Sequence, residues 1–121
     1  MNKKILLIDD EVDFTEVVST LLRFHDFDVE VFNDPIEVEP TLDKNNYDLI
    51  VTDLMMPHLS GFELIDLIQK KEKYKNVPII VLSAKSMTDS ERKTLLQAKT
   101  HCLTKPFDTR TLVDLICELV G

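Results

Sequence analysis

The segment "LIVTDLMMPHLSG", residues 49–61, joins an apolar strand that is expected to be buried to a lone carboxylate. Residues 49–51 are a continuous apolar run, which is typical of a strand covered on both faces. Asp53 follows that run, and the segment closes on Gly61, one of only two glycines in the chain. A carboxylate at the end of such a strand raises the question of which groups lie beside it.

Apolar runs of the same kind recur at residues 5–8 and 79–82, and residues 29–32 and 102–104 are weaker strand candidates. Segments with the apolar spacing of helices separate these runs. The alternation predicts an α/β fold, a doubly wound five-stranded parallel sheet with helices on both faces.

Helix start signals support this fold. They are two capping boxes, Ser60 with Glu63 and Thr88 with Glu91, and two capping aspartates, Asp34 before Pro35 and Asp108 after residues 106–107. A proline inside a helix removes an amide and clashes with the preceding turn. We therefore expect Pro40 to kink the second helix or to delay its start.

Composition limits the function. The 121 residues are 44% hydrophobic and 30% charged, as expected for one soluble domain over residues 1–121. A net charge of −8 disfavours nucleic-acid or membrane binding, and no apolar run reaches membrane-spanning length. Cys102 and Cys117 form no metal or redox motif, so we expect a cytoplasmic protein with free thiols.

Polar residues stand at the end of four predicted strands, and these are Asp9 and Asp10, Asp53, Ser83 and Lys105. Each alone is commonly a turn, cap or surface residue. The carboxyl ends of parallel strands share one edge of the sheet, so these side chains are expected to meet. Crowded carboxylates repel one another, which favours a bound cation, and an oxygen-only ligand set suits Mg²⁺.

A carboxylate, a hard cation, a lysine and a hydroxyl are the groups that phosphoryl transfer onto an aspartate requires. Asp53 is the candidate nucleophile. Mg²⁺ and Lys105 would neutralise charge on the phosphoryl oxygens, and Ser83 would donate a hydrogen bond to one of them. The positive groups would also keep Asp53 ionised against the upward pKa shift that its acidic neighbours cause.

The motifs "ILLIDDE" (5–11), "DLIVTDLMMPHLSGFEL" (48–64), "PIIVLSA" (78–84) and "LTKPF" (103–107) together resemble the receiver domains of bacterial two-component response regulators. The resemblance covers the whole chain. It implies a flavodoxin-like fold with strand order 2-1-3-4-5. It also implies a phosphorelay switch, rather than an enzyme acting on other substrates, that takes its phosphoryl group from a histidine kinase or a histidine phosphotransfer protein.

The resemblance also assigns residue roles by matching position. Asp53 is then the phosphoacceptor, Asp10 a direct Mg²⁺ ligand, Asp9 a ligand through water, and Met55 a ligand through its backbone carbonyl. Lys105 and Ser83 contact the phosphoryl group, and the peptide before Pro106 is cis. The output partner is not implied, although the surface formed by the fourth helix, fifth strand and fifth helix is the expected output face.

The chain departs from the family pattern after its fourth strand. Cys102 replaces the usual switch aromatic and is too small to fill its space. The segment "LLQAKTHC" (95–102) lacks the usual glycine, so we expect the left-handed helix stop to be replaced. The helix over residues 88–98 has few apolar residues, and we hypothesise that it is loosely held and carries the signal.

Two flanking residues leave alternatives open. Met55 and Lys85 stand two positions after Asp53 and Ser83. Either both simply face solvent, or Met55 fails to orient hydrolytic water and Lys85 screens the phosphoryl group, which would slow its hydrolysis.

Three other functions compete with the switch. An aspartyl phosphatase would need D-x-D after the first strand, where this chain has Asp9-Asp10-Glu11. A nucleotide or flavin module would need a glycine-rich loop after that strand, and neither glycine lies there. The third alternative is a non-phosphorylated receiver-like scaffold or protein-interaction module, which the loss of the aromatic keeps open.

Overall fold

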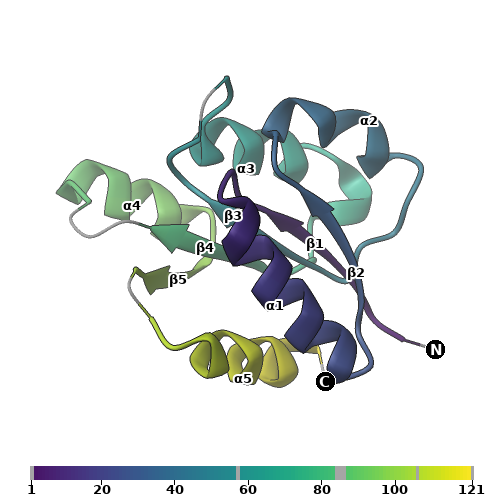
Figure 1. The fold of residues 1–121 in the computed structure, drawn as a ribbon. Coiled ribbons are helices and arrows are strands. Elements are labelled where there is room, and N and C mark those ends of the chain that lie inside the picture. The colour runs from purple at the N-terminus through teal and green to yellow at the C-terminus, as the bar shows by residue number, and fades with distance from the viewer. Residues whose placement is uncertain (1, 57, 84–86, 106, 121) are drawn as a thin grey trace.

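A computed structural model describes residues 2–56, 58–83, 87–105 and 107–120. At its centre lies a parallel sheet in the order β2-β1-β3-β4-β5 (Figure 1). The strands are β1 (Lys4–Ile8), β2 (Asp28–Phe32), β3 (Leu49–Asp53), β4 (Ile79–Ser83) and β5 (His101–Thr104). The predicted fold and strand order are confirmed, and both weaker strands form, each beginning one residue earlier than expected.

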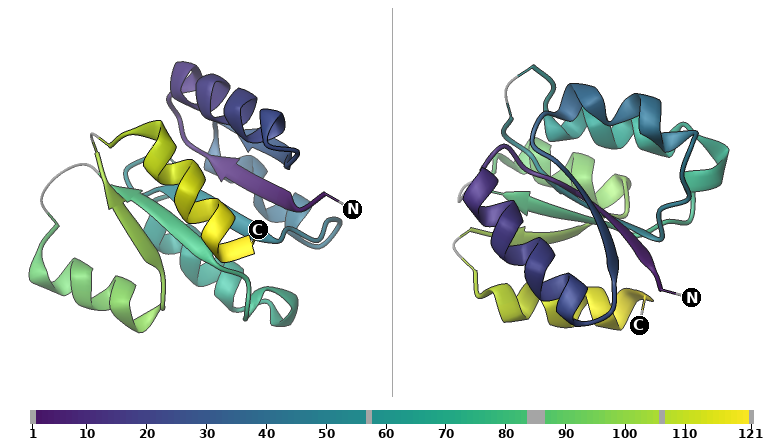
Figure 2. Two further views of the ribbon diagram at one scale, coloured as in Figure 1. Left: turned by 90° about the horizontal axis from the view of Figure 1, so that it is seen from below. Right: turned by 45° about the vertical axis from the view of Figure 1, so that its right-hand side comes forward.

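Helices cover both faces of the sheet. They are α1 (Val12–Phe24), α2 (Glu39–Leu42), α3 (Gly61–Gln69), α4 (Asp89–Gln97) and α5 (Thr109–Val120), with short 3-10 helices η1 (Pro35–Glu37) and η2 (Glu72–Tyr74). Figure 2 shows α1 and α5 against one face and α2 and α3 against the other. Each face has its own apolar core, one around Leu22 and Ile116 and the other around Leu64 and Leu95.

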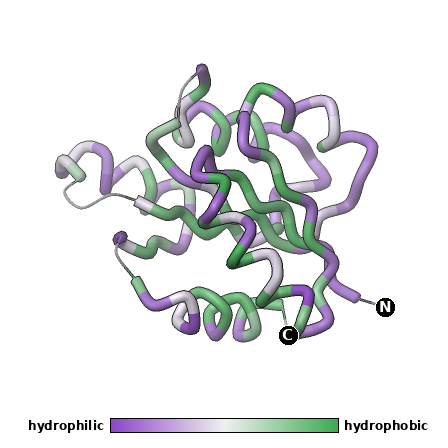
Figure 3. Tube along the Cα trace, in the orientation of Figure 1, coloured by the Kyte–Doolittle hydropathy of each residue, from purple (hydrophilic) through white to green (hydrophobic). Residues whose placement is uncertain are grey.

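The central strands are apolar along their length because both of their faces are buried (Figure 3). The residues of β3 and β4 are all buried, including the polar Thr52, Asp53 and Ser83. Polar groups in such strands need a partner or a function, and these three stand at the carboxyl end of the strands.

The helix start signals form as predicted. Both capping boxes are complete, around Ser60 and around Thr88. Asp34 accepts a hydrogen bond from the Ile36 amide at 3.1 Å, and Asp108 accepts one from the Arg110 amide at 2.9 Å. The effect of Pro40 is also confirmed, because the α-helix begins only at Glu39 and so places this proline in its first turn.

The end of α4 corrects one expectation. We expected the left-handed stop to be replaced, but Lys99 adopts that conformation with a φ of 59°. The amides of Lys99 and Thr100 donate to the carbonyls of Leu96 (3.1 Å) and Leu95 (3.3 Å), which is the Schellman pattern. The helix can end in this way without glycine because the two hydrogen bonds offset the backbone strain at Lys99, which is about 1–2 kcal/mol.

The fourth helix is held at few points. Leu95 is its buried residue, whereas Leu96 is 76% exposed. Beyond the helix, the Ala98 carbonyl accepts a hydrogen bond from the Gln69 side chain at 2.6 Å. Cys102 lines a groove of about 190 Å³ between α4 and β5.

Among the helices of the described residues, none has both the length and the apolar character needed to cross a membrane.

Candidate functional site

Three carboxylates meet at the carboxyl edge of β1 and β3. The parallel register pairs Ile8 with Thr52, so the residues that follow each strand emerge side by side. Carboxylate oxygens of Asp9, Asp10 and Asp53 all lie within 4.8 Å of one another. Asp9 and Asp53 are buried and Asp10 is exposed, so the cluster opens to solvent on the side of Asp10.

The two oxygens of Asp53 have different surroundings. Oδ1 accepts a hydrogen bond from the Leu54 amide at 2.8 Å, which fixes the carboxylate on its strand. Oδ2 faces the Lys105 ammonium at 3.4 Å. The first residue of α3 supports this arrangement, because the Gly61 amide donates to the Leu54 carbonyl at 2.8 Å.

Lys105 crosses the sheet edge from beyond β5 to the acidic cluster. Its Nζ contacts Asp9 Oδ2 at 3.1 Å, Glu11 Oε1 at 3.0 Å and Asp53 Oδ2 at 3.4 Å. Its backbone amide donates to the Ser83 carbonyl, which ties the lysine to the end of β4. The ammonium has three donors, and these three carboxylates can accept all of them.

Aromatic rings form one wall beside Lys105. Its Nζ lies 5.1 Å from the centre of the Phe14 ring, within the range of a cation–π contact. Phe14 in turn packs edge-to-face on Phe107, with ring centres 5.9 Å apart. We expected neither Phe14 nor Glu11 at the site, since both belong to the start of α1 and only the fold brings them to the lysine.

Hydrogen bonds from two neighbouring groups hold Asp9 in place. The Glu11 amide donates to Asp9 Oδ1 at 3.0 Å, and the Asn33 side chain donates to the Asp9 carbonyl at 2.7 Å and to Thr15 Oγ1 at 3.0 Å. Asn33 follows β2, the neighbour of β1, and was also missed from the sequence. A polar residue directly after a strand was the signal that could have identified it.

The Ser83 hydroxyl is buried without a hydrogen-bond partner among the described residues. Register places it on the strand beside Asp53, since Leu82 pairs with Asp53 and Ser83 is the next residue. A buried unpaired hydroxyl costs about 1–3 kcal/mol. Such a group, at the edge that also carries Asp53 and Lys105, fits a site that receives an oxygen-rich ligand.

Burial governs the ionisation of the cluster. Desolvation raises the pKa of Asp9 to about 6 and also raises the pKa of Asp53. For Asp53 we had expected acidic neighbours to raise the pKa, but burial is the largest cause, and Lys105 opposes it. Burial lowers the pKa of Lys105, yet its hydrogen bonds to Glu11 and Asp9 outweigh this and raise that pKa overall.

The donor set fits a divalent cation. One ammonium faces three carboxylates, with Asp10 beside them, so the cluster carries excess negative charge. All of its ligand atoms are oxygens, which suits Mg²⁺.

Met55, expected to offer its backbone carbonyl, follows β3 and is 69% exposed as a residue. Lys85 and Pro106 lie outside the described residues.

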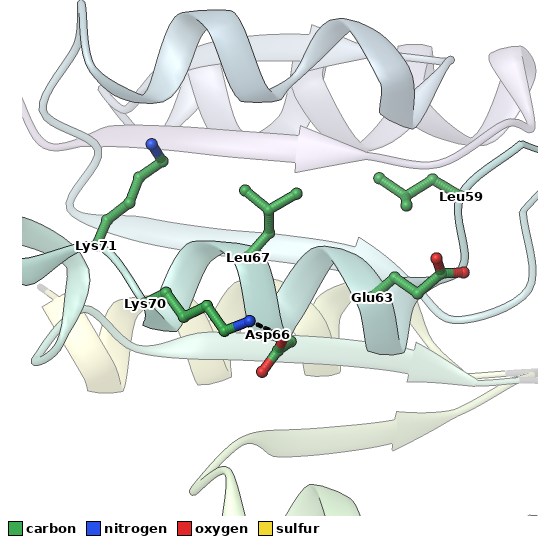
Figure 4. A pocket seen from close by; sticks show the side chains of 6 residues that line it. All are labelled: Leu59, Glu63, Asp66, Leu67, Lys70 and Lys71. Atoms are coloured by element: carbon green, nitrogen blue, oxygen red, sulfur yellow. Dashed lines mark ion pairs between the residues drawn. The ribbon is translucent and has the colours of Figure 1, made fainter.

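Another groove, separate from the one beside Cys102, lies away from this cluster. It is a groove of about 540 Å³ along α3, lined by Leu59, Glu63, Asp66, Leu67, Lys70 and Lys71 (Figure 4). The Asp66–Lys70 ion pair, 3.0 Å long, crosses its wall. The groove contains none of the residues predicted for the site.

Comparison with known proteins places the chain in a family. The model of the response regulator receiver domain matches residues 5–117. The transcriptional regulatory protein CpxR homolog of Haemophilus influenzae is 38% identical over 91% of this chain and 47% of its own length. Chemotaxis protein CheY-3 of Vibrio cholerae is 30% identical over 98% of this chain and 92% of its own length. The chain thus spans about half the length of several curated relatives that it matches.

Solved structures agree with this result. Chemotaxis protein CheY4 of Vibrio cholerae superimposes with a TM-score of 0.89 at 26% identity, covering 99% of this chain and 100% of its own. The receiver domain of sensor histidine kinase PA1611 from Pseudomonas aeruginosa, solved with a magnesium ion in its active site cleft, gives a TM-score of 0.85 at 29% identity, covering 100% and 99%. This chain therefore belongs to the response regulator receiver family, the signalling domains of two-component systems.

Proposed function

We propose that residues 1–121 form one receiver domain that switches when Asp53 accepts a phosphoryl group in the presence of Mg²⁺. The donor is a phosphohistidine on a histidine kinase or a histidine phosphotransfer protein. The observation that best supports this is the Ser83 hydroxyl, which is buried and has no hydrogen-bond partner in the described part of the chain. It lies on the strand beside Asp53, at the edge where Lys105 also lies. If Asp53 had only a structural role, nothing would require a buried hydroxyl without a partner beside it.

We assign the attacking atom from the hydrogen bonds that Asp53 makes. Because the Leu54 amide binds Oδ1, Oδ2 is the oxygen that attacks phosphorus. The new O–P bond forms as the P–N bond to the donor imidazole breaks, and the electron pair leaves on that nitrogen. Lys105 shifts from Oδ2 to a phosphoryl oxygen, and Ser83 donates to another. The domain thus contributes positioning and electrostatic stabilisation of the transferred group.

The residues that would hold Mg²⁺ are Asp10 and Asp53 directly, Asp9 through water, and Met55 through its backbone carbonyl. When bound, the ion neutralises negative charge on the carboxylates and on the phosphoryl oxygens. Asn33 and the Glu11 amide fix Asp9 from behind, so that this carboxylate does not need to reorganise. The magnesium ion of the PA1611 receiver domain supports the assignment.

The signal leaves the site through α4. This helix is attached by Leu95 and by the Gln69–Ala98 hydrogen bond, and Cys102 leaves the groove beside it open. An aromatic side chain therefore does not report the state of the site. With a net charge of −8, output goes to a protein partner or effector domain rather than to nucleic acid.

Incubation with acetyl phosphate and Mg²⁺, followed by intact mass measurement, tests the proposal. We expect a gain of one phosphoryl group that requires Mg²⁺ and is lost in Asp53→Asn. Asp66→Asn, an exposed aspartate of α3, is the matched control and should be phosphorylated like the wild type. No gain, or a gain that survives Asp53→Asn, would instead favour the non-phosphorylated scaffold.

A further inference from the structure

Glu11 is the acidic residue at the site that the reaction above does not use through its side chain. It occupies the N-cap position of α1, where a side chain normally binds the first amides of the helix, yet it makes no such hydrogen bond. Its carboxylate instead reaches Lys105 at 3.0 Å, the shortest of the three contacts of that ammonium.

Position distinguishes Glu11 from the other two carboxylates that contact Lys105. The Asp9 and Asp53 side chains are almost fully buried, whereas the Glu11 side chain is 63% exposed. Glu11 therefore lies on the solvent side of Lys105, the side from which a phosphoryl donor must arrive. A phosphoryl group on Asp53 Oδ2 would need the same ammonium for its oxygens.

The geometry points to Glu11 as the resting-state counter-ion of Lys105, a positioning residue that an incoming phosphoryl group must displace. It lowers the rate at which Asp53 becomes phosphorylated, because part of the charge on Lys105 is neutralised until the Glu11 contact breaks. This inference rests on the proposed function, since it concerns the same transfer to Asp53.

Two variants of Glu11 separate contact from charge. Glu11→Gln removes the charge and weakens the contact with Lys105. Glu11→Asp keeps the charge, but aspartate at an N-cap binds the helix amides and is one methylene too short to reach outward. Asp13→Asn, in the exposed first turn of the same helix, removes an equal charge away from the described contacts of Lys105.

The test measures the rate of phosphorylation by acetyl phosphate at saturating Mg²⁺, in low and in high salt. We expect Glu11→Gln and Glu11→Asp each to raise the rate by about three- to fivefold, the size of one exposed ion pair. Asp13→Asn should stay within about 1.5-fold of wild type in high salt, where general charge effects are screened. A merely structural role would slow the reaction or leave it unchanged.

A second readout needs no phosphorylation. The NMR signal of the Lys105 ammonium, recorded without Mg²⁺ or donor, should shift in Glu11→Gln and Glu11→Asp but not in Asp13→Asn. If the signal shifts while even the wild type is never phosphorylated, the proposed function fails but the counter-ion contact stands. Unchanged or reduced rates in both Glu11 variants, or an equal increase in Asp13→Asn, would overturn the inference.

Discussion

Gly61 lies so close to the backbone of Asp53 that no side chain fits between them. A β-carbon at position 61 would overlap the Asp53 carbonyl oxygen and lie 2.6 Å from Leu54 Cα. The φ of Gly61 is not in the left-handed region, so close approach rather than backbone conformation requires glycine here. The start of α3 is thereby pressed against the segment that carries Asp53.

Gly61→Ala should therefore both destabilise the domain and disturb the site. We expect a loss of about 1–3 kcal/mol in the free energy of unfolding, because the backbone has to move. Asp89 is the first residue of α4 and also follows the N-cap residue of a capping box. Asp89→Ala should change the free energy of unfolding by less than about 0.5 kcal/mol. Urea unfolding of both variants is the measurement, and equal small effects would contradict the packing explanation.

Ser83→Ala should stabilise the fold while impairing phosphorylation. Its hydroxyl is buried and unpartnered among the described residues, so its removal relieves a desolvation cost of about 1 kcal/mol. Ser19→Ala provides the contrast, because that buried hydroxyl donates to the Glu16 carbonyl at 3.2 Å and should not be improved by removal. Thermal unfolding and the phosphorylation rate are measured together. A clear loss of stability in Ser83→Ala would show that the hydroxyl has a structural partner.

Lys99→Gly should raise the stability of the domain by about 0.5–1 kcal/mol. Glycine adopts the left-handed conformation that Lys99 holds under strain, although it also adds entropy to the unfolded chain. Lys93→Gly, in the interior of α4, should lower the stability by about 1 kcal/mol. Chemical denaturation measures the stability of both variants. If Lys99→Gly is destabilising, the contacts of the lysine side chain contribute more to stability than the backbone strain costs.

Magnesium affinity should depend on pH through Asp9. Burial raises its pKa from 3.8 to about 6, so the native state holds this proton more tightly than the unfolded chain does. The contribution of Asp9 to stability is therefore present at about pH 4 and is lost as the pH rises through 6. The raised pKa of Asp53 acts in the same direction.

Two measurements check this linkage. Below pH 6 the Mg²⁺ affinity should fall by up to about tenfold per pH unit, because the ion competes with the proton. The metal-free Asp9→Asn variant should be more stable than wild type at pH 7, with the difference shrinking towards pH 4. A pH-independent affinity between pH 5 and 7, measured by calorimetry, would contradict the assignment of Asp9.

Amides of α4 should exchange faster than those of α3, a helix of equal length with more buried residues. Mg²⁺ and beryllofluoride, a phosphoryl mimic, should change the protection of residues 88–98 while leaving α3 nearly unchanged. Hydrogen exchange with mass spectrometry measures both. Strong and equal protection of residues 88–98 in the two states would exclude α4 as the carrier of the signal.

Periodicity and turn chemistry were enough to predict the sheet, its helices and their starts, because apolar runs and capping residues act locally. The convergence of Asp9, Asp53 and Lys105 also followed, since parallel strands share one edge. Glu11 and Asn33 could not be predicted as site residues, because their roles depend on side-chain reach across elements. The prediction that α4 would end without a left-handed residue was wrong. Lys99 adopts that conformation because two hydrogen bonds outweigh the local preference for glycine.

A crystal structure with Mg²⁺ and beryllofluoride tests most directly whether Asp53 accepts a phosphoryl group at this site. We predict that the mimic bonds to Asp53, that the Ser83 hydroxyl and Lys105 ammonium each contact one of its fluorines, and that Mg²⁺ lies against Asp10 and Asp53. Beryllofluoride absent from Asp53, or bound there with Ser83 and Lys105 turned away, would contradict the claim that these residues form one phosphoryl-accepting site.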